Sequence, residues 1–189
     1  MATFKELNAY YDILKKAFDS NNESYYFNND RSHNATVLRF MFDNSSNICM
    51  YCGELSVLRD GFYSHFENKE DVDKVKGALI DSFTHFMNCN GTSLSIVLEN
   101  YRDFGFKDLI CKEVFEKKMK EGKLLLYRLH DDFSFKSDIN HFSFSDSNIV
   151  RFEEDKEQHS AICVFHNKRY LDSMKKNFGI LSDMAVRIY

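Results

Sequence analysis

The chain has 189 residues, of which 43% are hydrophobic and 15% aromatic, so it can bury a core and has the size of one domain. Its formal net charge of −4 argues against a role in coating DNA or an anionic membrane through overall charge, although a local basic patch stays open. The N-terminus lacks a basic segment followed by an apolar one, and no apolar run approaches the length of a membrane span. We therefore expect a cytoplasmic single domain, with 1–30 as an N-terminal extension of one helix and a loop, and 31–189 as its core.

The first two thirds of the chain predict helices alternating with single strands. Apolar residues that recur every three or four positions indicate amphipathic helices, and short apolar runs bounded by Asn or Gly indicate buried strands. The predicted elements are a helix over 4–18, an Asn- and Ser-rich loop over 20–29, a helix over 30–44 with Asp30 as its N-cap, a strand over 48–52, a helix over 57–66, a helix over 71–86, a strand over 93–98, a helix over 109–119 and a strand over 123–129.

The last third of the chain changes to consecutive strands, which implies antiparallel pairing. The predicted elements are a strictly alternating strand over 141–146, a turn at 146–148, strands over 149–153 and 161–165, and a helix over 170–178 that ends at Gly179. The fold class is therefore α/β with an α+β tail, in which a mixed β-sheet is flanked by helices.

A family resemblance lies in the strand Ile139-Asn140-His141-Phe142-Ser143-Phe144-Ser145-Asp146, which is followed by Arg151-Phe152-Glu153. Together with the order of helices and strands before it, this segment resembles the phospholipase D-like (HKD) superfamily, as a single-motif member, over about 35–179. The family motif is H-x-K-x-x-x-x-D, in which the histidine attacks a phosphodiester, the lysine neutralises it and the aspartate stands at a turn. The resemblance implies that 31–189 is a phospholipase D-like core. It also implies a homodimer, because single-motif members build their site across a two-fold interface.

Neither register of the motif restores the histidine–lysine pair. With the turn aspartate on Asp146, Ile139 takes the nucleophile position and His141 the lysine position. With the nucleophile on His141, Ser143 stands where lysine belongs and Asn148 where aspartate belongs. Because a phosphohistidine mechanism needs a nucleophilic imidazole and a fixed cation on the phosphate oxygens, we expect a degenerate site and a pseudoenzyme. His141 remains either a catalytic residue of a non-standard site or a half-buried strand histidine.

A charged strand end follows the motif, and it offers two alternatives. Arg151 either binds phosphate or closes an intramolecular ion pair with one of the acids at 153–155. Placed on the strand beside His141, it forms with that histidine a candidate anion-binding site. Glu153 is the second candidate catalytic residue.

Other chemistry is less well supported by the sequence. Cys49-Met50-Tyr51-Cys52 falls on a predicted strand, whose alternation points the two cysteines to opposite faces, and no second C-x-x-C exists. With an odd total of five cysteines, reduced thiols are expected, and no metal site or cofactor. The lysines within 112–123, or Lys168, Arg169, Lys175 and Lys176, form either a nucleic-acid patch or a solvated helix face, and the acids interleaved with the first group favour the solvated face.

Three functions compete. The first is a non-catalytic phospholipase D-like interaction or scaffold module, a homodimer that docks a partner protein, and the missing histidine–lysine pair favours it. The second is a phosphodiesterase or nuclease that uses His141 with Arg151 or Glu153 in a non-standard site. The third is a nucleic-acid-binding module without cleavage, which holds phosphates through Arg151 and neighbouring lysines.

Overall fold

A computed structural model gives the architecture of the chain, and it describes residues 2–28, 31–66, 68–99, 106–130, 133, 138–155 and 160–188. In this part of the chain the helices are α1 (Phe4–Asp19), α2 (Arg31–Asn44), α3 (Lys69–Asn88), α4 (Lys112–Lys120) and α5 (Lys168–Asp183), with short 3₁₀ segments η1 (Ser56–Leu58), η2 (Asp60–His65) and η3 (Phe106–Asp108). The strands are β1 (Ser24–Asn28), β2 (Asn47–Cys52), β3 (Ser93–Leu98), β4 (Leu124–Leu129), β5 (Phe142–Ser145), β6 (Ile149–Asp155), β7 (Ser160–Phe165) and β8 (Ala185–Arg187).

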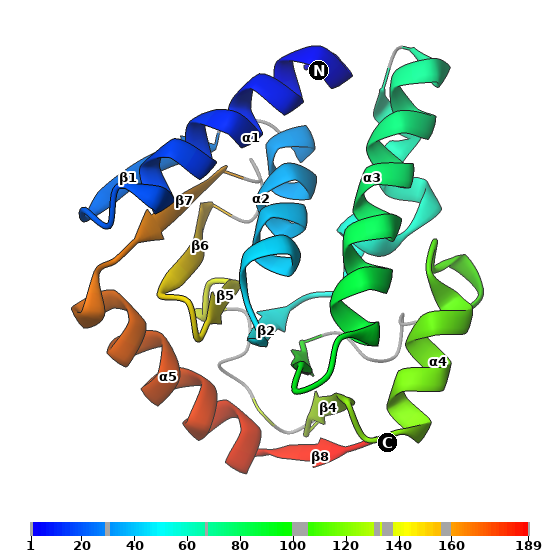
Figure 1. Ribbon diagram of the computed structural model, residues 1–189. Coiled ribbons are helices and arrows are strands. Elements are labelled where there is room, and N and C mark those ends of the chain that lie inside the picture. Colours follow the sequence, from blue (N-terminus) through cyan, green and yellow to red (C-terminus); the bar gives the residue numbers. More distant parts are fainter. Residues whose placement is uncertain are drawn as a thin grey trace.

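The strands form one mixed sheet in the order β1-β7-β6-β5-β2-β3-β4-β8, with helices on both faces (Figure 1). The pairs β2–β3 and β3–β4 are parallel, and the other neighbours are antiparallel. Helices α1 to α4 pack on one face around a large apolar cluster, and α5 packs on the opposite face around a smaller one. The expected mixed α/β sheet with flanking helices is therefore confirmed.

Local sequence signals explain where the main helices begin. Thr3 caps α1 by accepting a hydrogen bond from the Glu6 backbone amide, while the Glu6 carboxylate accepts one from the Thr3 amide. Asn68 caps α3 by accepting from the Glu70 amide. The buried apolar residues of both helices belong to the large apolar cluster, as their helical spacing predicts. Among the helices of the described residues, none has the length and apolar character that crossing a bilayer needs.

The topology brings four strand ends to one edge of the sheet. Strands β2 and β3 are parallel, so both end at this edge. Strand β5 runs antiparallel to β2 and begins here, and β6 runs antiparallel to β5 and ends here. Polar residues at these ends come from distant parts of the sequence, and the candidate site forms where they meet.

The turn between β5 and β6 is tied to the start of β2 by one carboxylate. Asp146 accepts hydrogen bonds from the Ser46 backbone amide (3.0 Å) and from the Asn47 side-chain amide (2.9 Å). Its own amide donates to the Asn47 carbonyl (3.0 Å). Burial, the largest single influence, disfavours the charged form, but the hydrogen bonds from Asn47 and Ser46 together outweigh it and hold the pKa of Asp146 below its ordinary value.

The low pKa of Asp146 predicts a loss of stability in acid that Asp146→Asn removes. Since the carboxyl has a lower pKa folded than unfolded, its contribution is complete above about pH 5 and disappears as the pH falls through the folded pKa. The free energy of unfolding, measured by urea titration between about pH 3 and pH 6, should therefore fall more steeply for the wild type than for the variant. Asp12→Asn, at an exposed position on α1, is the control. If its free energy of unfolding depended on pH as weakly as that of Asp146→Asn, Asp146 would not be the source of the effect.

Several predicted elements need correction. The loop expected over 20–29 is wrong for 24–28, because Ser24–Asn28 forms β1 and pairs antiparallel with β7. The helix expected over 57–66 is wrong, since the segment forms the 3₁₀ pieces η1 and η2. The last helix continues through Gly179 to Asp183, and the strand β8, which the sequence did not indicate, follows it. The predicted N-cap Asp30 lies outside the described residues, and the boundary between extension and core at residue 30 stays a prediction.

Candidate functional site

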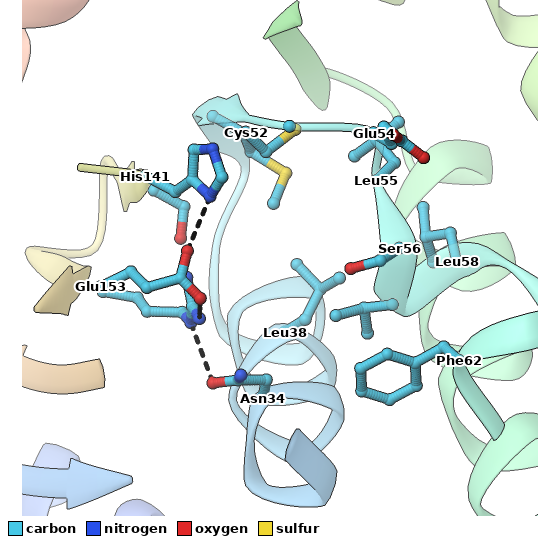
Figure 2. Close-up of a pocket in the computed structure, with 15 residues that line it drawn as sticks. Asn34, Leu38, Cys52, Glu54, Leu55, Ser56, Leu58, Phe62, His141 and Glu153 are labelled. Carbon is cyan, nitrogen blue, oxygen red and sulfur yellow. Dashed lines mark hydrogen bonds and ion pairs between the residues drawn. The ribbon is translucent and has the colours of Figure 1, made fainter. Parts of the chain in front are cut away.

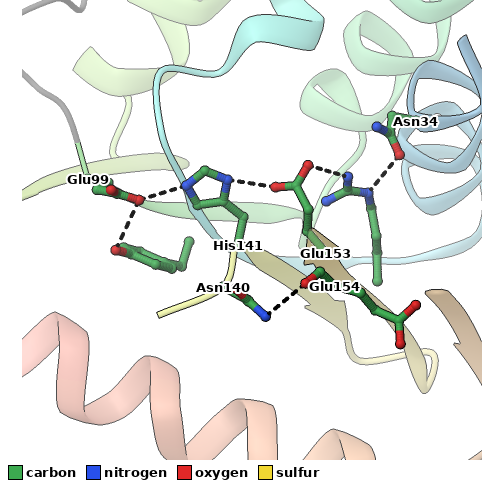
Figure 3. A network of polar contacts seen from close by, with 8 residues as sticks. Asn34, Glu99, Asn140, His141, Glu153 and Glu154 are labelled. Carbon is green, nitrogen blue, oxygen red and sulfur yellow. Dashed lines mark hydrogen bonds and ion pairs between the residues drawn. The ribbon is translucent and has the colours of Figure 1, made fainter. Parts of the chain in front are cut away.

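His141 is the centre of the candidate site, immediately before β5. Its Nδ1 lies 2.7 Å from Glu153 Oε2 and its Nε2 lies 2.7 Å from Glu99 Oε2 (Figure 3). The side chains of all three residues are largely buried, with 19% of His141, 11% of Glu99 and 7% of Glu153 exposed. A histidine held between two buried carboxylates is therefore the main feature of this edge of the sheet.

The two contacts of His141 determine how many protons the group holds. A neutral imidazole has one N–H group and can donate to one carboxylate only. For both 2.7 Å contacts to be hydrogen bonds, either the imidazole carries both protons or one of the two carboxyl groups is protonated. Both contacts can be hydrogen bonds at the same time only when the group of Glu99, His141 and Glu153 holds one proton more than a neutral histidine beside two carboxylates. Charge-assisted hydrogen bonds of this kind are among the stronger ones in proteins.

The backbone fixes both carboxylates where they meet His141. The Glu153 amide donates to the His141 carbonyl (2.8 Å), which continues the β5–β6 ladder by one residue pair. The Glu99 amide donates to the Cys52 carbonyl (2.8 Å), and this holds Glu99 at the end of β2 and β3. Tyr51 donates its hydroxyl to Glu99 Oε2 (3.4 Å). Burial, and after it the Glu99 charge, raises the pKa of Tyr51, so its hydroxyl stays protonated.

Arg151 extends the group of polar residues along β6. Its Nη2 lies 3.5 Å from Glu153 Oε1, and its Nε donates to Asn34 Oδ1 (3.2 Å) from α2. The structure thus contains the ion pair that the sequence offered as one alternative for Arg151. Across the sheet Arg151 stands opposite Ser143, while Glu153 stands opposite His141. His141 and Arg151 are brought together, but both contact the same carboxylate.

The backbone at residue 53 approaches His141 closely. A Cβ atom added to Gly53 would lie 3.3 Å from Cε1 and 3.6 Å from Nε2 of the imidazole. Any larger residue would press against the ring that Glu99 and Glu153 hold. Gly53 therefore has a packing reason to lack a side chain.

A cavity of about 140 Å³ opens beside these residues, between the sheet and the segment after β2 (Figure 2). One wall is polar and carries Asn34, His141, Arg151 and Glu153. The facing wall comes from α2, residues 53–58 and η2, and it is mostly apolar, with Glu54 and Ser56 as its polar residues. The remaining lining residues, apart from these four, are Leu38, Met50, Cys52, Gly53, Glu54, Leu55, Ser56, Val57, Leu58, Phe62 and Ser143.

The other motif positions lie apart from one another. Ser143 is buried on the same face as His141, and its hydroxyl donates to Met41 Sδ (3.3 Å). Ile139 packs against the cluster under α5, on the opposite face. Asp146 and Asn148 lie in the turn at the far end of β5, and Asn148 has a left-handed backbone (φ 58°). In neither register does a lysine stand beside His141.

The cysteine and lysine patterns have structural explanations. Cys49 packs with the cluster under α5 and Cys52 with the cluster under α2, so the pair points to opposite faces as predicted. Burial raises the pKa of Cys49 to about 11 and that of Cys52 to about 12, which keeps both thiols protonated. Within the described ranges, no group of three or more His, Cys, Asp or Glu side chains is suited to a metal ion.

On α4 and just after it, lysines pair with the interleaved glutamates. Lys112 and Lys117 are exposed, as expected of a solvated helix face, whereas Lys118 is buried. The contacts are Lys112–Glu116 (3.9 Å), Lys117–Glu121 (4.0 Å) and Lys118–Glu121 (2.8 Å).

The solved structures that are similar to the chain over most of its length include the following two. TrmBL2, an archaeal chromatin protein whose structure shows a novel mode of DNA binding, aligns with a TM-score of 0.59 and 15% identity. The alignment covers 97% of this chain but 65% of the TrmBL2 chain, so this chain spans less than two thirds of its length. Nuc from Salmonella typhimurium, a phospholipase D family member, aligns with a TM-score of 0.55 and 11% identity, over 88% of this chain and 98% of Nuc. The fold is phospholipase D-like.

This likeness concerns the fold, because the identities are 15% and 11%. No protein-family model and no curated protein sequence matches the chain. The resemblance drawn from the strand around His141 is thus confirmed for the phospholipase D-like architecture. A shared fold does not by itself give the site of this chain a function.

Among these residues, sequence reasoning identified His141, Arg151 and Glu153 but missed Glu99, Asn34 and the cavity. Glu99 directly follows a predicted buried strand, and a polar residue in that place is a usable signal for a site at a sheet edge. Asn34 lies within a predicted helix, and nothing in the sequence around it indicates that its side chain belongs to the site.

Proposed function

We propose that the chain is a non-catalytic phospholipase D-like interaction module, which works as a homodimer and docks a partner protein. One observation carries the non-catalytic part: Nε2 of His141 is covered by Glu99 Oε2 at 2.7 Å, while Nδ1 is bound to Glu153. A nucleophilic imidazole needs one ring nitrogen directed at phosphorus. Here both nitrogens face carboxylates, and a phosphodiester would have to displace one of them.

The charge at the site also opposes phosphodiester chemistry. Attack on a phosphodiester builds negative charge on the phosphate oxygens, and enzymes stabilise it with fixed cations or N–H donors. Among the described residues that line the cavity, Arg151 is the one lysine or arginine, and Glu153 already pairs with it. With Glu99 and Glu153 within 2.7 Å of His141, an incoming anion would meet two buried carboxylates.

An exposed apolar patch supports the docking part of the proposal. Ile180, Met184 and Val186 lie where α5 runs into the edge strand β8, and they are 49%, 41% and 38% exposed (Figure 1). Apolar side chains gathered on a surface mark interaction sites. The homodimer rests on the resemblance to single-motif phospholipase D-like proteins.

The purified chain is expected to be a dimer by light scattering and to leave phosphodiesters intact. The assay uses bis(4-nitrophenyl) phosphate together with single- and double-stranded DNA, with and without EDTA. No hydrolysis above the buffer rate is expected. Glu99→Ala should be equally inactive, because uncovering Nε2 does not supply the missing cation.

His141→Ala, purified in the same way, is the control for contaminating nucleases. Metal-independent cleavage by the wild type that is lost in His141→Ala would overturn the proposal in favour of a non-standard phosphodiesterase. A strict monomer at all concentrations would remove the homodimer.

A nucleic-acid-binding module without cleavage is the second candidate. Its support is the likeness of fold to TrmBL2, whose structure shows DNA binding, and to Nuc. Binding through phosphates has an affinity that falls steeply with salt, because bound counterions are released. Fluorescence anisotropy with labelled DNA at several salt concentrations separates this candidate from the first.

A further inference from the structure

The cavity beside His141 has two unlike walls, and together they define what could occupy it. Figure 2 shows Asn34, Glu153 and His141 on one side and Leu55, Ser56, Leu58 and Phe62 on the other, with Leu38 from α2 between them. The volume of about 140 Å³ is close to that of cavities that hold a benzene-sized molecule. The leucines and the phenylalanine of one wall offer apolar contact area, whereas hydrogen bonds can come from the polar wall and from the Ser56 hydroxyl.

The apolar wall is built on a strained backbone. Leu55 has φ 57° and ψ 40°, a left-handed conformation that is uncommon for a residue with a bulky side chain, and it is 5% exposed. The segment is held by hydrogen bonds from Arg59 Nε to the Glu54 carbonyl (2.8 Å) and from the Leu58 amide to the Leu55 carbonyl (2.9 Å). Residues kept in such conformations cluster at ligand-binding sites, where strain is tolerated because it shapes the pocket.

The polar wall determines which chemical group fits. Both nitrogens of His141 and both carboxylate oxygens of Glu153 already have partners. Arg151 uses Nε and Nη2, and within the described residues no hydrogen bond of its Nη1 occurs. A guanidinium has five N–H donors, so Arg151 can donate further to a group in the cavity that it lines. The polar wall therefore suits a ligand that carries a hydrogen-bond acceptor.

The charge of the acceptor follows from the neighbours of Arg151. A carboxylate or phosphate ligand would be desolvated close to Glu153, and Glu99 lies just beyond His141. A cation would bring a second positive charge to Arg151. An uncharged oxygen meets neither penalty and still accepts from the guanidinium.

We propose that this cavity binds a small uncharged amphipathic molecule of about the size of a substituted benzene. A hydroxyl or carbonyl oxygen accepts a hydrogen bond from Arg151, and an aromatic or branched apolar body packs on Leu38, Leu58 and Phe62. A binding site of this kind is a property beyond the proposed interaction module. The proposal does not depend on whether the chain cleaves phosphodiesters.

The test uses probes that share one apolar body and differ in the polar end: benzyl alcohol, benzamide, benzoate, benzylamine and toluene. Titrations are followed by two-dimensional amide NMR of the full chain. The alcohol and the amide should shift resonances of the lining residues, and the charged probes and toluene should bind at least about tenfold more weakly.

Ser56→Phe fills the cavity from an exposed position without removing a buried side chain, and Figure 2 shows the Ser56 hydroxyl directed toward the cavity. Ser64→Phe is the matched control, at an exposed position of η2 outside the lining. Both should keep the dispersed spectrum of a folded chain, and only Ser56→Phe should lose the probe-induced shifts. The proposal is overturned if neither uncharged probe binds, if Ser56→Phe binds as well as Ser64→Phe, or if the charged probes or toluene bind equally well.

Discussion

Glu153→Ala is expected to lower the free energy of unfolding by about 3–5 kcal/mol, the range measured when one partner of a buried ion pair is removed. Glu153 is 7% exposed and contacts both His141 (2.7 Å) and Arg151 (3.5 Å, an ion pair). Without it, Arg151 keeps its hydrogen bond to Asn34 but loses its carboxylate, and His141 keeps Glu99. Two polar groups would thus lose a charged partner at once, at a place where water has little access.

The measurement is urea unfolding at neutral pH. Glu154→Ala is the matched control, since Glu154 is the next residue on β6 and its side chain is exposed. It should change the free energy of unfolding by no more than about 0.5 kcal/mol. Equal effects of the two substitutions would show that the contacts of Glu153 do not hold this edge of the sheet together.

The part of the site that lies on β5 and β6 could be predicted because the connection between the strands is short. A turn at 146–148 between two alternating strands places Phe142 opposite Phe152, and the next pair outward is His141 and Glu153. The sequence identified both residues and the turn. The position of Arg151 beside His141 was predicted less well, since Arg151 stands opposite Ser143 and is diagonal to His141.

Glu99 could not be paired with His141 from the sequence, because the contact depends on two further register choices. It requires β3 to lie parallel to β2, and β2 to lie antiparallel to β5, over a separation of 42 residues. The cavity depends in addition on the left-handed Leu55, and local sequence gives no sign of a leucine in that conformation.

The edge strands were missed for a related reason. Ser24–Asn28 stands in an Asn- and Ser-rich stretch whose composition indicates a loop, and its partner β7 is more than 130 residues further along the chain. Strand β8 has three residues, too few for an alternating pattern. Edge strands bury less of their surface than central ones, so their sequences carry a weaker apolar signal.

Phe165→Ala is expected to destabilise the protein by about 3–5 kcal/mol, the usual cost of truncating a fully buried phenylalanine. Phe165 ends β7 and is 0% exposed. Its ring packs against the rings of Phe18, Tyr26 and Phe40, with centroid separations of 5.9, 6.0 and 5.5 Å. It therefore connects α1 and β1, which lie within 1–30, with α2 and the sheet.

The shape of the unfolding transition of the wild-type chain also tests whether residues 1–30 unfold together with the rest of the molecule. Because Phe165 touches both parts, α1 should lose its structure in the same transition as the sheet, with coincident curves from far-ultraviolet circular dichroism and tyrosine fluorescence. Phe27→Ala removes the same atoms from a 66% exposed position on β1 and should cost less than about 1 kcal/mol. An early transition confined to α1 would mean that 1–30 is an extension added to an independently stable core, whereas one cooperative transition would make it part of the core.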